Sequence, residues 1–444
     1  MKSYAERRAD LIARMQAKGG GVAIIPTAPE VARNSDAHYP YRHDSYFYYL
    51  SGFTEPEAVI VLVAGDKPQS ILFCREKNLE REIWDGFRYG PDAARNAFGF
   101  DAAYPIAALD EQMPKLIGDT PALFYALASD PALDTQVQSW LKKVRAQTRA
   151  GIVGPSTAHD VHVLLNEMRL FKSPEEAGVM RRAAQISAAA HARAMHTTAP
   201  GQHEYQVEAE LLHEFRRNGS EFPAYTSIVA AGANACVLHY RAGNAVLNDG
   251  DLVLIDAGCE LDSYASDITR TFPVNGVFSP AQKTLYEIVL AAQAAAIAEI
   301  RPGKRFMDGH DAAVKTLAYG MLDTGLLDKN KVGTVEDVIE KGAYRQFYMH
   351  RTGHWIGMDV HDVGEYRDAG PGTEQPKPWR VLQPGMALTV EPGIYVRPAE
   401  GVPEQYWNIG IRIEDDALVT ENGCEILSID APKSVADIES LMKR

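Results

Sequence analysis

The sequence predicts two domains, an α/β domain over residues 1–171 and an α+β domain over residues 172–444. Short apolar strands alternate with helical stretches in the first part, which is typical of an α/β sheet. A helix with strong capping signals begins after Ser173 and marks the boundary. Beyond it, two helices followed by strands occur twice in succession. This element order predicts a duplicated helix–helix–antiparallel sheet unit.

Composition excludes several classes of partner. The chain has 444 residues, of which 46% are hydrophobic and 23% charged, and its net charge is −14. An acidic chain without a Lys/Arg run is not expected to bind nucleic acid or an anionic membrane. No segment reaches the roughly 18 apolar residues that a transmembrane helix needs. The sequence therefore favours a soluble enzyme, or a surface that a cationic ligand could approach.

Cysteine usage and the N-terminus bear on the compartment. The four cysteines show no CxxC spacing, so neither a disulfide framework nor a cysteine zinc site is expected. Free thiols are typical of a reducing compartment. The first 20 residues carry charges every few positions and lack the apolar core of a secretory signal. We expect a cytoplasmic protein.

The first domain is predicted to begin with a helix that buries Leu11, Ile12 and Met15 on one face and ends at Gly19. Apolar strands follow from Gly21, over residues 57–65 and over residues 70–74. Between the first two strands, residues 39–53 are dense in aromatic side chains. We expect these aromatic side chains to pack in the core and at interfaces.

The second domain is predicted to begin with a long helix. Ser173-Pro174-Glu175-Glu176 combines a capping box with proline at the first helical position. A second helix ends at Gly219. After several strands, another helix opens with Ser279-Pro280 and closes at Gly303, and a fourth spans about Met307 to Leu322.

A carboxylate at the end of an apolar strand is the first candidate for chemistry. Residues 252–255 are all apolar and end on Asp256, and the return strand over 268–273 brings Asp267 back beside it. Burying an unpaired carboxylate is costly, so the pair favours a bound cation. The alternative interpretation is a pair of solvated turn aspartates, because aspartate is common in turns.

Three further segments place polar residues where core residues are expected. One holds His350, His354 and His361 among glycines, which oppose the helical metalloprotease pair that the four-residue spacing could mimic. Glu391 follows an apolar strand. Arg412 and Glu414 lie in the segment NIGIRIED, where apolar and other residues alternate as they do in a strand.

Each of these residues also has a structural explanation. The histidines could be hydrogen-bonded core residues, Glu391 a turn carboxylate, and Arg412 with Glu414 an exposed ion pair. Four strand ends that all carry a carboxylate or an imidazole favour a common site instead. The set is Asp256, Asp267, His354, Glu391 and Glu414.

This set predicts two divalent cations, because four carboxylates carry a nominal charge of −4. Oxygen-rich ligands with one nitrogen suit Mn²⁺ best and also accommodate Fe²⁺, Co²⁺ or Zn²⁺. Two ions about 3.5 Å apart can share a hydroxide that is nucleophilic at neutral pH and can polarise a carbonyl. The predicted chemistry is therefore hydrolytic.

The five residues and the motifs HWIGMDVHDVG, VEPGIY and GIRIED resemble those of the pita-bread metallopeptidases, over about residues 172–440. That family includes methionine aminopeptidase, prolidase, creatinase and aminopeptidase P. The segment NSDAHYPYRHDSYFYYLSGFTEPEAVIVL resembles the N-terminal domain of the aminopeptidase P branch. The resemblance implies a pita-bread catalytic domain preceded by a smaller α/β domain, and an exopeptidase that cleaves after the first residue of peptides with proline second.

The resemblance also implies roles for the metal ligands. Asp256 would chelate one ion, His354 and Glu391 would hold the other, and Asp267 and Glu414 would bridge the two. Glu391 would in addition relay a proton from the bridging water towards the leaving nitrogen.

Substrate contacts are implied by the same resemblance. His239 and His361 would donate hydrogen bonds to the scissile carbonyl and the tetrahedral intermediate. Arg412 and Tyr395 would orient the site, and His350 would line the pocket for the substrate proline.

Trp84 resembles a tryptophan that family members supply to this pocket from another subunit, which implies a homotetramer or homodimer. Packing within the N-terminal domain is the alternative role for this side chain.

Two rival functions are distinguishable. A prolidase would share the scaffold and metals but cleave only dipeptides with C-terminal proline. His354-Trp355, Trp84 and the N-terminal segment favour the aminopeptidase. A pita-bread protein that only binds a partner would lack metal ligands, whereas all five are present here.

Overall fold

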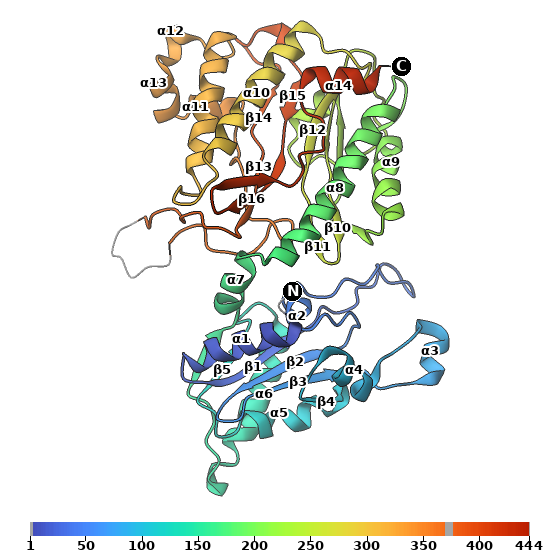
Figure 1. Cartoon of the computed structure of the whole chain (residues 1–444), viewed down its shortest axis with the longest axis vertical. Coiled ribbons are helices and arrows are strands. Elements are labelled where there is room, and N and C mark those ends of the chain that lie inside the picture. The colour runs from blue at the N-terminus through green and yellow to red at the C-terminus, as the bar shows by residue number, and fades with distance from the viewer. Residues whose placement is uncertain (1–2, 369–375, 444) are drawn as a thin grey trace. The chain divides into compact units, whose positions relative to one another are not determined.

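The computed structural model describes residues 3–368 and 376–443. The chain forms two compact units, Met1–Met168 and Arg169–Arg444, which are coloured along the sequence in Figure 1. No helix in the described ranges is long and apolar enough to cross a membrane.

The N-terminal unit is built on a mixed six-stranded sheet in the order β4-β3-β2-β1-β5-β6. β1 lies at its centre, antiparallel to β2 and parallel to β5. The strands predicted from Gly21, over 57–65 and over 70–74 are β1, β2 and β3. The strands are β1 Gly21–Pro26, β2 Val59–Ala64, β3 Gln69–Cys74, β4 Ala102–Pro105, β5 Ala122–Tyr125 and β6 Thr157–Asp160.

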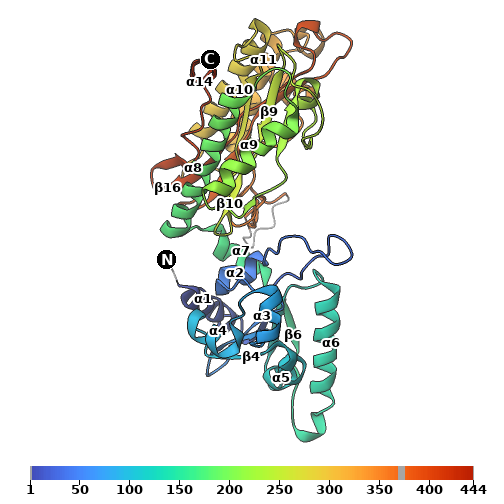
Figure 2. The ribbon, with the colours of Figure 1, turned by 90° about the vertical axis from the view of Figure 1, so that its right-hand side faces the viewer.

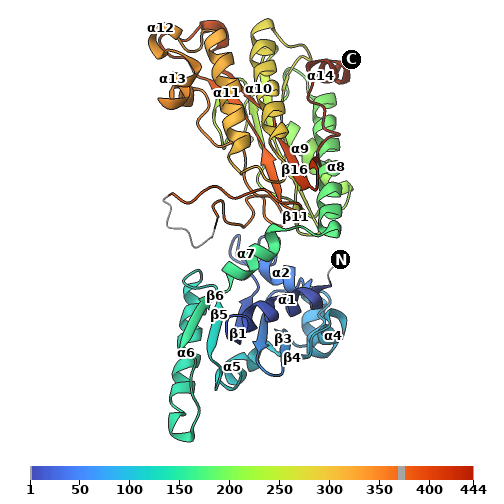
Figure 3. The same cartoon turned by 60° about the vertical axis from the view of Figure 1, so that its left-hand side comes forward.

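Helices cover this sheet on both sides (Figure 3). Alternation along the strands turns Val22, Ile24 and Val61 towards α5 and α6, where Trp140 is fully buried. The predicted N-terminal helix, α1, packs against β2 and α2. The helices are α1 Tyr4–Gln16, α2 Ser45–Ser51, α3 Leu79–Asp85, α4 Gly90–Phe98, α5 Leu109–Ile117, α6 Pro131–Arg145 and α7 His162–Leu170, the last of which leads into the second unit.

Two pairs of long helices frame the second unit. The predicted capping box is formed, because the Ser173 hydroxyl accepts a hydrogen bond from the Glu176 N–H and the Glu176 carboxylate accepts one from the Ser173 N–H. α8 packs on α9 and α10 on α11 (Figures 1 and 2). The helices are α8 Pro174–Thr197, α9 Glu204–Arg217, α10 Pro280–Ala298, α11 Asp308–Asp323, α12 Lys329–Val332, α13 Val335–Glu340 and α14 Val435–Met442.

Short antiparallel strands lie between the helix pairs, and one hydrophobic core runs through both halves (Figure 1). The order of helix pair, strands, helix pair and strands confirms the predicted α+β duplication. The strands are β7 Phe222–Pro223, β8 Ile228–Ala231, β9 Leu252–Asp256, β10 Cys259–Leu261, β11 Tyr264–Ala265, β12 Thr269–Pro273, β13 Ala387–Val390, β14 Gly393–Val396, β15 Ile409–Arg412, β16 Asp415–Thr420 and β17 Gly423–Ile426.

Candidate metal centre

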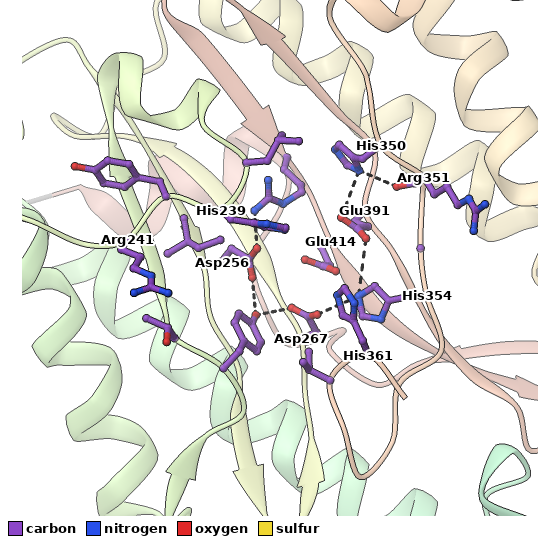
Figure 4. A pocket seen from close by; sticks show the side chains of 18 of the residues that line it. His239, Arg241, Asp256, Asp267, His350, Arg351, His354, His361, Glu391 and Glu414 are labelled. Carbon is purple, nitrogen blue, oxygen red and sulfur yellow. Dashed lines mark hydrogen bonds and ion pairs between the residues drawn. The ribbon is translucent and has the colours of Figure 1, made fainter. Parts of the chain in front are cut away.

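Asp256 and Asp267 meet across one hairpin. Asp256 is the last residue of β9 and pairs with Thr269 on β12. Asp267 lies two residues before β12, and its backbone N–H donates to the buried carboxylate of Asp416 at 3.0 Å. Both side chains project into the same cavity (Figure 4), so the expected convergence of this pair is observed.

The second half of this unit contributes two acids, Glu391 and Glu414, from positions at the ends of strands. Glu391 follows β13, and its N–H donates to the carbonyl of Thr352 at 2.8 Å. Glu414 lies between β15 and β16, and its N–H donates to the carbonyl of Thr269 at 3.1 Å. This last bond joins the two halves beside the hairpin, which places a carboxylate from each half in one cluster.

The predicted ligands gather closely. Ligand atoms of Asp267, His354 and Glu414 all lie within 4.8 Å of one another, and these residues are buried. His354 Nε2 lies 3.4 Å from Asp267 Oδ2 and 3.9 Å from Glu391 Oε1. Asp256 flanks this cluster on the other side (Figure 4).

Local hydrogen bonds orient the histidine. His354 Nδ1 lies 3.0 Å from the carbonyl of Trp355. A ring N–H at Nδ1 donates to that carbonyl, so Nε2 is the nitrogen that would give up its proton and offer a lone pair to an ion held between the carboxylates. Such an arrangement is typical of a metal-binding imidazole.

Arg412 and Tyr225 bind the outer side of Asp256. Arg412 Nη2 lies 2.5 Å from Asp256 Oδ2, and Nη1 donates to the Tyr395 hydroxyl at 3.0 Å. The Tyr225 hydroxyl is 2.5 Å from Asp256 Oδ1 and also contacts Asp267. Because this hydroxyl has one proton, it bonds one of the two carboxylates at a time.

The electrostatics of the cluster are those of acids crowded together. Burial, followed by the negative charges of neighbouring acids, raises the pKa of Asp267 and raises the pKa of Glu414 well above its usual range. Burial also raises the pKa of Glu391 to about 7. Burial alone would lower the pKa of His354, but the hydrogen bond and charge of Asp267 outweigh it and raise that pKa to about 9.

These residues fit divalent cations. Four carboxylates share the cluster, and the Arg412 guanidinium at its edge donates a hydrogen bond to one of them, Asp256. Burial and the mutual repulsion of the acids raise the pKa values of Asp267, Glu391 and Glu414, which favours added positive charge beside them. Divalent ions between the carboxylates would supply that charge, and the set of oxygens with one imidazole nitrogen suits hard to borderline metals.

A cavity of about 630 Å³ opens beside the cluster. The predicted substrate-facing histidines line it: His239 belongs to the loop after β8, while His361 lies against His354 with ring centroids 3.9 Å apart. Burial, then the charges of neighbouring histidines, lowers the pKa of His361 to about 4. Its imidazole is therefore neutral near pH 7.

His350 belongs to the same wall. Its Nε2 lies 2.9 Å from the Tyr395 hydroxyl, and its Nδ1 lies 3.6 Å from Glu391. Burial, followed by the charge of Arg412, lowers the pKa of His350 to about 3. The neutral His350 imidazole therefore lines the cavity next to the carboxylates, and the buried Tyr395 hydroxyl holds it from behind.

Trp84 lies on α3 in the N-terminal unit, and 82% of its surface is exposed. Leu79, Ile83 and Phe87 around it are also exposed. The alternative of packing within its own domain is therefore wrong.

Tyr225 and Thr269 belong to the site but were not predicted from the sequence. Tyr225 precedes β8 without any pattern of its own, and only the pairing of Ile228 with Asp256 places it beside the acids. Thr269 donates from its hydroxyl to Glu414 at 2.6 Å and accepts from Arg412 at 3.1 Å. The available signal for Thr269 was its place in the predicted return strand, two positions after Asp267, where the structure buries it fully.

The chain matches two protein-family models. The model of metallopeptidase family M24 matches residues 178–421, and that of the aminopeptidase P N-terminal domain matches residues 4–125.

Known relatives match the chain along its whole length. It is 44% identical to the Xaa-Pro aminopeptidase of Escherichia coli K12, covering 99% of this chain and 97% of the relative. The structure of Pseudomonas aeruginosa aminopeptidase PepP superimposes with a TM-score of 0.94 and 50% identity, covering 99% of this chain and 97% of that one. Zinc-substituted E. coli aminopeptidase P in complex with product gives a TM-score of 0.91 and 44% identity, covering 98% of each chain.

The fold and the clustered acids therefore define a metal-dependent peptidase, and the chain belongs to metallopeptidase family M24. Within that family, its N-terminal unit and its full-length similarity identify it as a member of the aminopeptidase P group.

Proposed function

We propose that this enzyme hydrolyses the peptide bond between the first residue and a proline in second position, and so releases the N-terminal residue. The observation that carries the proposal is the convergence of Asp267, His354 and Glu414 beside a cavity lined by His239 and His361. Full-length similarity to Xaa-Pro aminopeptidases supports the substrate class.

The metal centre in this proposal holds two divalent ions, with Mn²⁺ as the preferred metal. Asp256 would hold one ion, His354 and Glu391 would hold the other, and Asp267 and Glu414 would serve both. When bound, the ions supply a hydroxide that is nucleophilic at neutral pH and polarise the scissile carbonyl. The four-carboxylate charge supports two ions, and the zinc-substituted relative supports metal exchange at such a site.

The protein's own groups handle charge and protons. His239 and His361 stabilise the developing oxyanion by hydrogen bonds, a role that a neutral imidazole N–H at His361 supports. Glu391 carries a proton towards the leaving nitrogen, a role supported by its position at the cavity beside His354. Arg412 and Tyr395 keep Asp256 and His350 in place.

Selection for proline follows from the chemistry of the bond. An Xaa-Pro amide has no N–H and a fixed φ, so peptidases that bond that N–H lose a contact. Recognition of the ring by an uncharged wall avoids this requirement. We assign that wall to His350, which the buried Tyr395 hydroxyl holds in place.

We further propose that the enzyme is a homotetramer or homodimer in which Trp84 approaches the site of another subunit. The exposed apolar side chains around Trp84 support a subunit contact on α3. The four cysteines are free, which fits a cytoplasmic location.

Peptide hydrolysis with defined substrates tests the function. The purified enzyme, loaded with Mn²⁺, is offered Xaa-Pro dipeptides, Xaa-Pro-Yaa tripeptides and matched Xaa-Ala-Yaa tripeptides. We expect cleavage of Xaa-Pro-Yaa to Xaa and Pro-Yaa, with little cleavage of the alanine series. Activity restricted to dipeptides would make the enzyme a prolidase instead, and metal analysis of the active fraction tests for two ions per chain.

A further inference from the structure

Glu204 is a buried acid that the reaction does not use. It is the first residue of α9, its side chain is fully buried, and its two oxygens accept four hydrogen bonds. Oε1 accepts from the Ala231 N–H at 2.9 Å and from Asn234 Nδ2 at 3.0 Å. Oε2 accepts from the Tyr240 hydroxyl at 2.9 Å and from the Gly243 N–H at 3.1 Å.

All four donors belong to one stretch of chain. Ala231 ends β8, and Gly243 closes the loop that follows it. We call residues 232–243 the His239 loop. Burying a carboxylate is costly without such partners, and hydrogen bonds to a charged acceptor are stronger than neutral ones. The carboxylate therefore ties the beginning, the middle and the end of this loop to α9.

The loop forms one wall of the catalytic cavity through Leu238, His239, Tyr240 and Arg241. Among the described residues, no hydrogen bond to the His239 imidazole is found, and this side chain is exposed to the cavity. Its position is therefore set by the backbone that carries it. The Tyr240 hydroxyl, bonded to Glu204 and to Asn234 Nδ2 at 3.0 Å, anchors the adjacent residue.

We propose that Glu204 is a positioning residue for the reaction, which acts by holding His239 where the scissile carbonyl binds. The proposal rests on the proposed function only through the role of His239. Glu204 touches neither the substrate nor the metal ligands, so its contribution passes through the loop.

A double-mutant cycle tests this coupling. In Glu204→Gln only one side-chain oxygen remains an acceptor, so the Gly243 N–H or the Ala231 N–H loses its partner. We expect kcat/KM for an Xaa-Pro-Yaa peptide to fall about tenfold, equivalent to about 1.4 kcal/mol. In the His239→Ala background, the same substitution should change kcat/KM less than about twofold, because the group that it positions is absent. An equal loss in both backgrounds would overturn the proposal.

Two variants control for damage to the fold. Glu208→Gln changes another glutamate one turn along α9, for which no hydrogen bond to the loop is found among the described residues, and it should leave kcat/KM and metal content unchanged. Tyr240→Phe deletes one of the four hydrogen bonds and should produce a smaller loss with the same dependence on His239. If Glu204→Gln loses metal or unfolds, the Tyr240→Phe cycle decides, and independence from His239 there also refutes the proposal.

Hydrogen exchange separates this proposal from the proposed function. Glu204→Gln should accelerate amide exchange at Ala231 and Gly243 while leaving β13 and β14 unchanged. Unaltered exchange at those two amides would refute the tie between Glu204 and the loop, whatever the activity. A wild-type enzyme that hydrolyses no Xaa-Pro peptide would instead refute the proposed function.

Discussion

Arg412 and Asp256 form a buried charged hydrogen bond in which Nη2 of Arg412 lies 2.5 Å from Oδ2 of Asp256. The same guanidinium donates to the Tyr395 hydroxyl and to the Thr269 hydroxyl. A lysine ammonium cannot reproduce this planar, three-way contact. Arg412→Lys should therefore lower kcat/KM at least about a hundredfold, equivalent to about 2.7 kcal/mol, as measured with an Xaa-Pro-Yaa peptide.

Arg181→Lys is the matched control for this change. Arg181 pairs with Glu425 at 2.7 Å, but both side chains are more than a third exposed. Exposed pairs contribute little, so activity should not change. Wild-type activity in Arg412→Lys would show that the site does not need the guanidinium contacts to Asp256, Tyr395 and Thr269.

Asp267→Ala should abolish both metal uptake and hydrolysis while the fold survives. The carboxylate of Asp267 lies in the close cluster with His354 and Glu414, so its loss removes a ligand from the centre of the site. A metal that binds the native state but not the unfolded chain raises the melting temperature, by an amount that grows with its affinity and concentration. The difference in melting temperature with Mn²⁺ and with chelator should be large in the wild type and near zero in the variant.

Removing one of several crowded acids should also leave the metal-free variant no less stable than the metal-free wild type, because the remaining carboxylates repel less. Asp430→Ala, at an exposed position, serves as the control and should retain metal. Full activity in Asp267→Ala would place the site elsewhere.

His361→Ala should lower kcat at least about a hundredfold, in line with loss of an oxyanion donor, with metal content retained. Its imidazole faces the cavity and stacks near His354 without joining the close ligand cluster. Metal analysis of the purified variant distinguishes the two roles. Loss of metal would make His361 a ligand.

His191 predicts an acid-sensitive fold. Its ring is fully buried on α8, Nε2 lies 2.9 Å from the carbonyl of Ala257, and burial lowers its pKa to about 4. An unfolded histidine has a pKa of about 6.5. Above about pH 6.5 this histidine is neutral in both states and does not reduce the free energy of unfolding. As the pH falls towards 4, the histidine of the unfolded chain takes up a proton while the buried one stays neutral, so the free energy of unfolding falls. About 3 kcal/mol of stability is lost over this window.

The measurement is the melting temperature between pH 4 and pH 7 in the presence of chelator. His191→Gln, which cannot titrate, should show a flatter pH dependence than the wild type. His196→Gln, at an exposed position on the same helix, should follow the wild type. Equal slopes for His191→Gln and wild type would refute the assignment.

Trp84→Ala should raise KM for peptide substrates several-fold without changing the melting temperature of the chain. The side chain is 82% exposed, so its removal costs little within its own unit. Val163→Ala, also exposed, should leave KM unchanged. Sedimentation of both variants reports whether subunit association depends on Trp84; an unchanged KM would leave the tryptophan without a part in substrate binding.

Local signals in the sequence were sufficient for the elements and for the ligand-bearing strand ends. The capping boxes at Ser173 and Ser279 and the glycines that close α1 and α9 fixed the helices, because these signals act through neighbouring backbone groups. Asp256 was conspicuous because an ionisable side chain ended an apolar strand.

Contacts between segments distant in the sequence could not be predicted from such local signals. Tyr225 meets Asp256 only because β8 pairs with β9 in a particular register. Glu204 had no pattern that linked it to Tyr240, since a glutamate at the start of a helix is favourable there for its charge alone. The strand predicted over Ile409 to Glu414 is in fact broken, with β15 ending at Arg412 and β16 beginning at Asp415. The break turns Glu414 towards the cluster.

The hydrogen bond from Glu414 to Thr269 joins chain segments more than a hundred positions apart, and neither hairpin alone assembles the cluster. Contacts of such long sequence separation form late when a chain refolds, because closing the intervening loop is slow. Metal binding should therefore occur only after the two halves have come together. We expect a refolding chain to reach a compact apoenzyme first and to bind its ions afterwards. Adding metal early would not speed its refolding.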